Sequence, residues 1–138
     1  MVARVELSAA RELFAGARVA RLATVRPDGR PHLVPIVFAV DGDVIVTAVD
    51  DVKAKRTRAL TRLANIAAEP QVCVLADHYD EDWSRLWWVR ADGIAGVRGA
   101  DADAVSLLAA KYPQYREQPP PGPVIRIQVE HWTGWSAQ

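Results

Sequence analysis

The stretch RVARLATVRPDGRPHLVPIVFAVDGDVIVTAV, residues 18–49, indicates the fold class of this chain. Apolar and β-branched residues typical of strands occupy 18–25, 32–40 and 44–49. The segments between them, RPDGRP and DGD, contain the proline, aspartate and glycine expected of tight turns and hairpins. Consecutive strands joined by such short turns predict an antiparallel meander.

The rest of the chain continues this pattern and adds short helices. Strands are predicted at 71–79, 86–99 and 124–132, and helices at 8–15, 55–68 and 103–112. Ser8 is the predicted N-cap of the first helix, Asp101 or Asp103 that of the last, and Gly93 and Gly96 predict a bend or bulge in the long strand. Six strands with three short helices predict a mainly β (α+β) chain. We expect a single domain over residues 1–138, folded as a closed or partly closed antiparallel barrel.

Composition narrows the classes of protein and partner. The 138 residues carry a formal net charge of zero, which argues against general nucleic-acid binding. Cys73 is the only cysteine, so no disulfide framework is expected, and its apolar surroundings in QVCVLA predict a buried structural thiol. No apolar run reaches the roughly 18 residues of a membrane span, so we expect no membrane partner and a cytoplasmic location.

Positive charge gathers at one strand-to-helix junction, DDVKAKRTRALTRL, residues 50–63. Cations at a helix N-terminus are locally unfavourable, because the unpaired N–H groups and the helix dipole are positive there as well. A bound phosphate or similar anion would remove this conflict. The alternatives are a solvated basic face, or neutralisation by Asp50 and Asp51 acting as caps.

Other candidates also allow two interpretations. Pro35 interrupts an apolar strand, which fits either a tolerated edge position or an irregular backbone that meets a flat ligand. Three of the five tryptophans lie within 80–90, where they fit core or interface packing, or a stacking platform. His32, His78 and His131 lack metal-ligand spacing. Because no GxSxG, HExxH or glycine-rich nucleotide motif occurs, a bound cofactor is the expected source of any chemistry.

Two spaced motifs resemble a known family. The order ATxxxDGxPxxxP at 23–35, followed by Nxxx(N/D/E)P at 65–70, is similar to the split-barrel flavin and deazaflavin oxidoreductases, the pyridoxamine-phosphate-oxidase-like proteins. The segment DEDWSRLWWVRADG, 80–93, resembles an actinobacterial subgroup assigned as coenzyme F420-dependent enzymes. The resemblance implies a six-stranded antiparallel split β-barrel of the FMN-binding-protein type.

The resemblance also implies a homodimer with two cofactor sites at the subunit interface. The implied cofactor-binding residues are His32, Val34, Pro35, Ile36, Thr47, Ala48, Lys53, Lys55, Arg56, Thr57, Arg62 and Trp87. Strand residues would face the ring and basic residues would hold the phosphate. Trp87, Trp88 or the C-terminal tryptophans, Trp132 and Trp135, would border the site from the partner chain. Other members often have a lysine where this chain has Arg62, so the phosphate ligand stays open among Lys55, Arg56 and Arg62.

The function implied is an F420-dependent oxidoreductase that transfers a hydride between the deazaflavin and a small electron-poor organic substrate. No side chain is then required as a catalytic acid or base. F420 has a longer acidic tail than FMN, so a basic cluster that extends over several residues favours F420. The alternatives are an FMN-dependent oxidase or reductase, and a non-enzymatic protein that binds flavin or haem on the same barrel.

Overall fold

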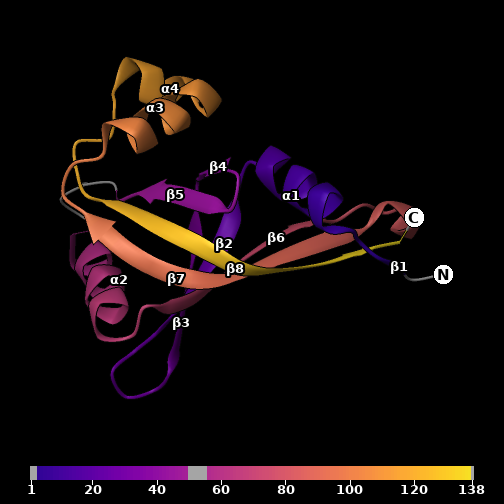
Figure 1. Ribbon diagram of the computed structural model, residues 1–138, viewed down its shortest axis with the longest axis horizontal. Helices are drawn as coiled ribbons and strands as arrows, with labels where there is room; N and C mark the ends of the chain where they lie inside the picture. Colours follow the sequence, from indigo (N-terminus) through magenta and orange to yellow (C-terminus); the bar gives the residue numbers. More distant parts are fainter. Residues whose placement is uncertain (1–2, 50–55, 138) are drawn as a thin grey trace.

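The computed structural model describes residues 3–49 and 56–137, and side chains over 5–49 and 61–137. A strongly curved antiparallel sheet forms the body of the molecule, and a long arm extends from it (Figure 1). The strands are β1 (Ala3–Arg4), β2 (Ala20–Val25), β3 (Pro31–Ile36), β4 (Ala39–Asp41), β5 (Val44–Ala48), β6 (Gln71–His78), β7 (Trp87–Arg98) and β8 (Val124–Ser136). The helices are α1 (Leu7–Gly16), α2 (Arg56–Ala68), the 3₁₀ turn η2 (Trp83–Arg85), α3 (Ala102–Lys111) and α4 (Pro113–Glu117).

The strands are hydrogen-bonded in the order β3-β2-β6-β7-β8-β5-β4, and β1 pairs with β8. This arrangement confirms the prediction of a mainly β, antiparallel split barrel with short helices. The described residues form eight strands where six were predicted, because Ala3–Arg4 adds a short strand and the segment 32–40 forms two. The predicted meander is wrong in one respect, because the segment 32–40 is two strands rather than one. These two strands, β3 and β4, lie at opposite ends of the sheet order, so the chain itself connects the two edges of the sheet.

The break between β3 and β4 falls at Val37 and Phe38, whose backbone groups bond to side chains. The Thr47 hydroxyl donates to the Val37 carbonyl at 2.7 Å. The Phe38 N–H donates to the Tyr112 hydroxyl at 3.1 Å, and that hydroxyl lies 3.0 Å from the carbonyl oxygens of Phe38 and Arg18. Buried backbone groups need partners, and here two distant side chains supply them, which allows the strand to bend.

The arm consists of the outer parts of β6, β7 and β8, which run side by side away from the barrel (Figure 1). The predicted irregularity near Gly93 is confirmed, because the pairing of β7 with β8 shifts register between Asp92 and Gly93. A Cβ atom on Gly93 would collide with the backbone oxygen of Gln128. Only glycine therefore fits at this bulge, where the arm leaves the barrel.

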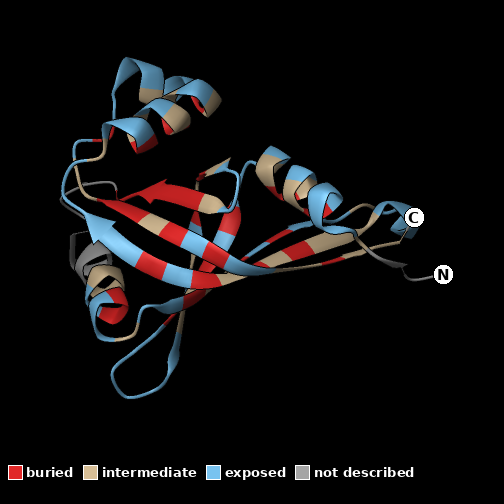
Figure 2. Cartoon of the chain, in the orientation of Figure 1, coloured by how far each residue is buried: buried red, intermediate tan, exposed pale blue. Residues whose placement is uncertain are grey.

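Two apolar clusters lie on the two faces of the sheet (Figure 2). The larger cluster fills the concave side, where Phe14 of α1 meets Phe38 and residues of β2, β5, β6 and β8. The smaller cluster lies outside, where Leu108 and Ala104 of α3 cover Val46 of β5 and Val124 of β8. Helix α3 therefore covers the outer surface over β5 and β8.

Local differences from the predictions occur at helix ends. Helix α1 begins at Leu7 after Glu6, so the predicted N-cap at Ser8 is wrong. Asp101 caps α3 by accepting a bond from the Ala104 N–H at 3.1 Å, which confirms one of the two proposed caps. Helix α3 ends at Lys111, and Pro113 begins the additional short helix α4, since proline is well suited to a first helical turn.

Candidate functional site

The predicted phosphate-binding junction is described only in part. Lys53 and Lys55, together with the alternative caps Asp50 and Asp51, lie outside the described residues. The backbone of Arg56 and Thr57 belongs to the first turn of α2, but their side chains are outside the described part. Arg62 is the one predicted phosphate ligand whose side chain is described, and the described part of the candidate site lies at the end of the barrel that carries Arg62.

Helix α2 is fixed to the sheet by a buried polar pair. The Asn65 amide donates to the Thr24 hydroxyl at 3.1 Å, and both side chains are 2% exposed. Arg62 precedes Asn65 by three residues, which places the two side chains on the same side of the helix. The pair therefore brings Arg62 to the end of the β2–β3 hairpin.

His32 faces Arg62 from this hairpin. It pairs with Thr24 across the two strands, and its Nδ1 atom is buried with no hydrogen-bond partner among the described residues. Burial lowers the pKa of His32, and the positive charges of Arg26 and Arg62 lower it further. Two arginines thus lie near enough to lower the pKa of His32, and His32 has a buried nitrogen with no partner among the described residues.

This arrangement has the chemistry of an anion site. Like charges that approach one another are unfavourable until an anion lies between them, and a buried polar atom without a partner costs free energy. A phosphate would relieve both conditions by accepting hydrogen bonds from arginine and from protonated histidine. The described residues of this end of the barrel therefore fit the phosphate of a flavin-type cofactor.

The predicted ring-facing residues of β3 lie on two faces of the strand. Val34 and Ile36 point to the concave side and pack against the larger core cluster, as the period of two requires. Pro35 points the opposite way and is exposed. A flat ring on one face of β3 can therefore contact the side chains of Val34 and Ile36 or that of Pro35, but not all of them.

The two predicted residues of β5 are also on opposite faces. Thr47 is 1% exposed and its hydroxyl is engaged with Val37 at the β3–β4 break. Ala48 belongs to the outer cluster, beneath α3. Both side chains are packed within the chain, and they point to opposite faces of β5, so a ring cannot contact both of them.

Trp87 lies far from His32 within one chain. It is the first residue of β7, in the arm, and pairs with His78 of β6. Strand β6 lies between the His32 hairpin and β7. Its residue Cys73 pairs with Ala23 of β2 on one side and with Asp92 of β7 on the other, so Asp92 is the part of β7 nearest the hairpin. Five residues of strand, roughly 17 Å at the usual rise, separate Asp92 from Trp87.

Other sequence expectations can also be compared with the structure. Cys73 is only partly buried, on the outer face of β6, so the prediction of a buried thiol is wrong in degree. Its pKa is raised, first by burial and then by the charge of Asp92. Over the described ranges, no group of His, Cys, Asp and Glu side chains is arranged to hold a metal ion, and no helix is both long and apolar enough to cross a bilayer.

Sequence reasoning missed Arg26 and the pairing of Thr24 with Asn65. Arg26 stands at the start of the β2–β3 turn, where a charged residue is unremarkable. The Asn65 motif was recognised, but its partner on β2 lies 41 positions away. Side chains alternate between the two faces of a strand, and counting outward from the predicted turn could have indicated that Thr24 and His32 share a face.

Comparison with known proteins supports the fold. A family model described as pyridoxamine 5′-phosphate oxidase matches residues 7–136. The comparison with curated proteins gave no match.

Three solved structures illustrate the similarity. An FAD-binding protein from Mesorhizobium loti has a TM-score of 0.73 at 20% identity, over 100% of this chain and 99% of that chain. The FAD-binding protein from Mycobacterium smegmatis has a TM-score of 0.64 at 18% identity, over 98% and 97%. The haem storage protein HutZ from Vibrio cholerae has a TM-score of 0.67 at 16% identity, over 88% and 87%. At these identities the similarity shows the fold alone.

Proposed function

Because the chain belongs to the pyridoxamine 5′-phosphate oxidase family, we propose that it is an oxidoreductase that binds coenzyme F420, with FMN as the alternative cofactor. The observation that carries this proposal is the convergence of Arg26, Arg62 and His32, with a buried Nδ1 atom that has no partner in the described structure. The flavin-binding proteins among its structural relatives support a cofactor of this class.

His32, Arg26 and Arg62 would hold the phosphate at the end of the barrel. Lys53, Lys55, Arg56 and Thr57 precede or begin α2, and we propose that they extend the anion site along the chain. A basic region of this length suits the longer acidic tail of F420 better than the single phosphate of FMN. Val34 and Ile36 would support the ring from the concave side of β3.

The cofactor, when bound, supplies hydride transfer to or from a small electron-poor organic substrate. The side chains of the chain bind and orient. The Thr24–Asn65 pair is buried and keeps α2 against the barrel, so it fixes Arg62 relative to His32. A proton on His32 would strengthen its hold on a phosphate, which makes His32 a binding residue.

We propose further that the chain forms a homodimer with the cofactor sites at the interface. The outer face of β2, β3 and β6 carries exposed apolar side chains, with Leu33 66% and Leu75 37% exposed. Leu33 directly follows His32 along β3, so the two side chains point to opposite faces of the strand. A partner on the outer face would therefore lie just across β3 from the anion site. Such a partner could bring its own Trp87 to the ring.

A titration that follows the cofactor's own fluorescence tests the cofactor proposal. We expect F420 to bind more tightly than FMN, and His32→Gln and Arg62→Gln each to weaken binding by about tenfold. Arg116→Gln is the control, because Arg116 is exposed on α4 and contacts only backbone carbonyls of α3 among the described residues. Tight binding of FMN with weak binding of F420 would favour FMN as the cofactor. No measurable binding of either cofactor would refute the proposal.

The pH dependence of the same titration gives a second criterion. The pKa of His32 is lowered in the free protein, and a bound anion would raise it. Cofactor affinity should therefore increase as the pH falls through the histidine range, because the complex takes up a proton. His32→Gln should remove this dependence. An affinity that is equally pH-dependent in the variant would place the titrating group elsewhere.

A further inference from the structure

An open cavity of about 820 Å³ lies between α1 and the arm, away from the barrel end that carries His32. Its walls are Val5, Ala9, Glu12, Leu13, His78, Arg85, Trp87 and Ser136. Its volume falls within the range of small-molecule sites, and it combines apolar walls with a few charged groups, as such sites do. Helix α1 lies close to the arm here, because a Cβ atom on Gly134 of β8 would lie only 3.2 Å from the Cβ of Val5 and 3.4 Å from the Cβ of Ala10.

One wall of the cavity is flat and aromatic. The indole of Trp87 and the imidazole of His78 are stacked, with centroids 6.4 Å apart and an interplanar angle of 19°. Both side chains are partly accessible, and both line the cavity. A planar molecule can therefore lie against Trp87 with Leu13 of α1 on its other side, since aromatic faces favour offset stacking of flat partners.

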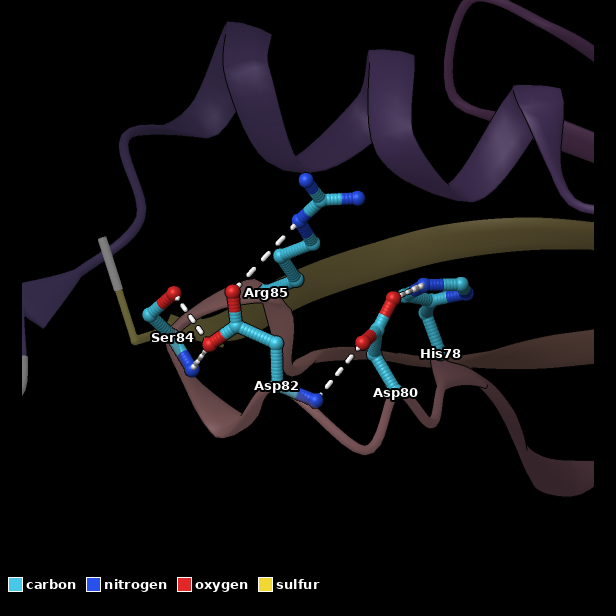
Figure 3. Close-up of polar contacts among 5 residues, drawn as sticks. All are labelled: His78, Asp80, Asp82, Ser84 and Arg85. Carbon is cyan, nitrogen blue, oxygen red and sulfur yellow. Dashed lines mark hydrogen bonds and ion pairs between the residues drawn. The ribbon is translucent and has the colours of Figure 1, made fainter.

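Arg85 supplies an anchored positive charge at the edge of this cavity. Figure 3 shows Arg85 reaching from the η2 turn toward the helix that crosses above it. Its Nε atom lies 3.7 Å from Asp82. Asp82 is itself fixed, because it accepts bonds from the Ser84 N–H at 3.1 Å and the Ser84 hydroxyl at 2.7 Å, which lower its pKa.

The anchoring leaves the outer nitrogens of Arg85 directed away from Asp82. A guanidinium presents its donors as a planar fork that matches a carboxylate. Because only the Nε edge approaches Asp82, the opposite edge can serve a ligand. The contact with Asp82 favours this orientation of an exposed arginine, and the ligand would replace solvent at the opposite edge.

The remaining charges around the cavity limit the charge of a ligand. The Nε2 atom of His78 lies 3.7 Å from the carboxylate of Asp80, beside the aromatic wall (Figure 3). Glu12 faces the same cavity from α1. A ligand with a second negative charge would meet Glu12, whereas one carboxylate can approach Arg85 and His78 on the opposite side.

From these contacts we propose that the arm cavity is a second ligand site, which binds a small planar aromatic carboxylate. The ring lies between Trp87 and Leu13, and the carboxylate lies at Arg85. Within one chain, roughly 17 Å of strand separates Trp87 from the residues near His32. In the proposed homodimer the same Trp87 would border the partner's cofactor ring, so the separateness of this site rests on the proposed function, and the test uses protein without cofactor.

Isothermal titration of the cofactor-free protein with 2-naphthoate tests this site. We expect 2-naphthoate to bind at least about fivefold more tightly than the neutral 2-naphthalenemethanol, and the cationic 2-naphthylmethylamine to bind most weakly. Arg85→Gln should remove the preference for the carboxylate and leave binding of the neutral probe unchanged. Arg30→Gln is the matched control, because Arg30 is an exposed arginine that contacts a nearby aspartate, Asp28.

A second variant tests the location without removing a contact of the arm. Ala9 is an exposed residue of α1 on the cavity wall, so Ala9→Trp should fill the space and abolish binding of all three probes. Equal affinity for the three probes, or 2-naphthoate binding that survives both Ala9→Trp and Arg85→Gln, would overturn the proposal. Absence of 2-naphthoate binding at millimolar concentration would overturn it as well.

Discussion

Two halves of the outer sheet surface differ in what covers them. Over β5 and β8, helix α3 packs on the sheet, and Leu108 and Val124 are 0% and 1% exposed. Over β2, β3 and β6, the described chain has no helix on the outer face, and Leu33, Val25 and Leu75 are 66%, 37% and 37% exposed (Figure 2). The same curved sheet thus has one covered half and one open half.

The difference indicates which half of the outer sheet surface is buried by the chain itself and which half stays accessible to another molecule. The covered half is attached by polar contacts as well as by apolar packing, because Tyr112 and Lys111 at the end of α3 bond to backbone groups of Phe38, Ala15 and Ala17. The open half has apolar side chains without such contacts. Exposed apolar groups that gather on one face are typical of an interaction surface.

The largest effect is expected from a truncation in the covered half. Leu108→Ala removes a fully buried side chain from the outer cluster and should lower the free energy of unfolding by about 3 kcal/mol. Leu33→Ala, at the open half, should change it by less than about 0.5 kcal/mol. Urea titrations at concentrations low enough to keep both proteins monomeric measure the pair. Similar losses for the two variants would contradict the distinction between the halves.

The second effect concerns association through the open half. Leu33→Asp places a charge in the middle of the proposed dimer interface, so the dimer dissociation constant should rise by about tenfold or more. Leu7→Asp is the matched control, because Leu7 is also an exposed leucine, 54% accessible, but lies on α1. Analytical ultracentrifugation measures both. A monomeric wild-type protein, or a dimer indifferent to Leu33→Asp, would refute the interface.

The sequence predicted most of the fold because its signals are local. Alternation along β2 and the turns before β3 and β5 depend on neighbouring residues only, and these hairpins were predicted correctly. The split of 32–40 could not be predicted in this way. It depends on Thr47 and Tyr112, which lie 10 and 74 positions from the backbone groups that they satisfy.

The candidate site was predictable only in part, for the same reason. The family resemblance implied His32 and Arg62 as candidates, but their approach depends on the docking of α2 through Thr24 and Asn65. The residues grouped around the ring include both faces of β3 and β5, because a run of neighbouring letters does not separate the faces of a strand. The arm cavity depends on where α1 crosses the sheet, which no local pattern specifies.

The smallest effect tests the attachment of the covered half through pH. Burial, followed by the charge of Arg18, lowers the pKa of Lys111 from 10.5 to about 8. Between these values the unfolded chain binds more protons than the folded chain, so the free energy of unfolding should rise as the pH increases above about 8. We expect a rise below about 1 kcal/mol up to about pH 9.5, given the partial exposure of Lys111. Urea titrations across this range should show the rise in the wild type and lose it in Lys111→Met. The same slope in both proteins would show that the ammonium over the Phe38 ring, 3.9 Å from its centroid, is not strained by burial.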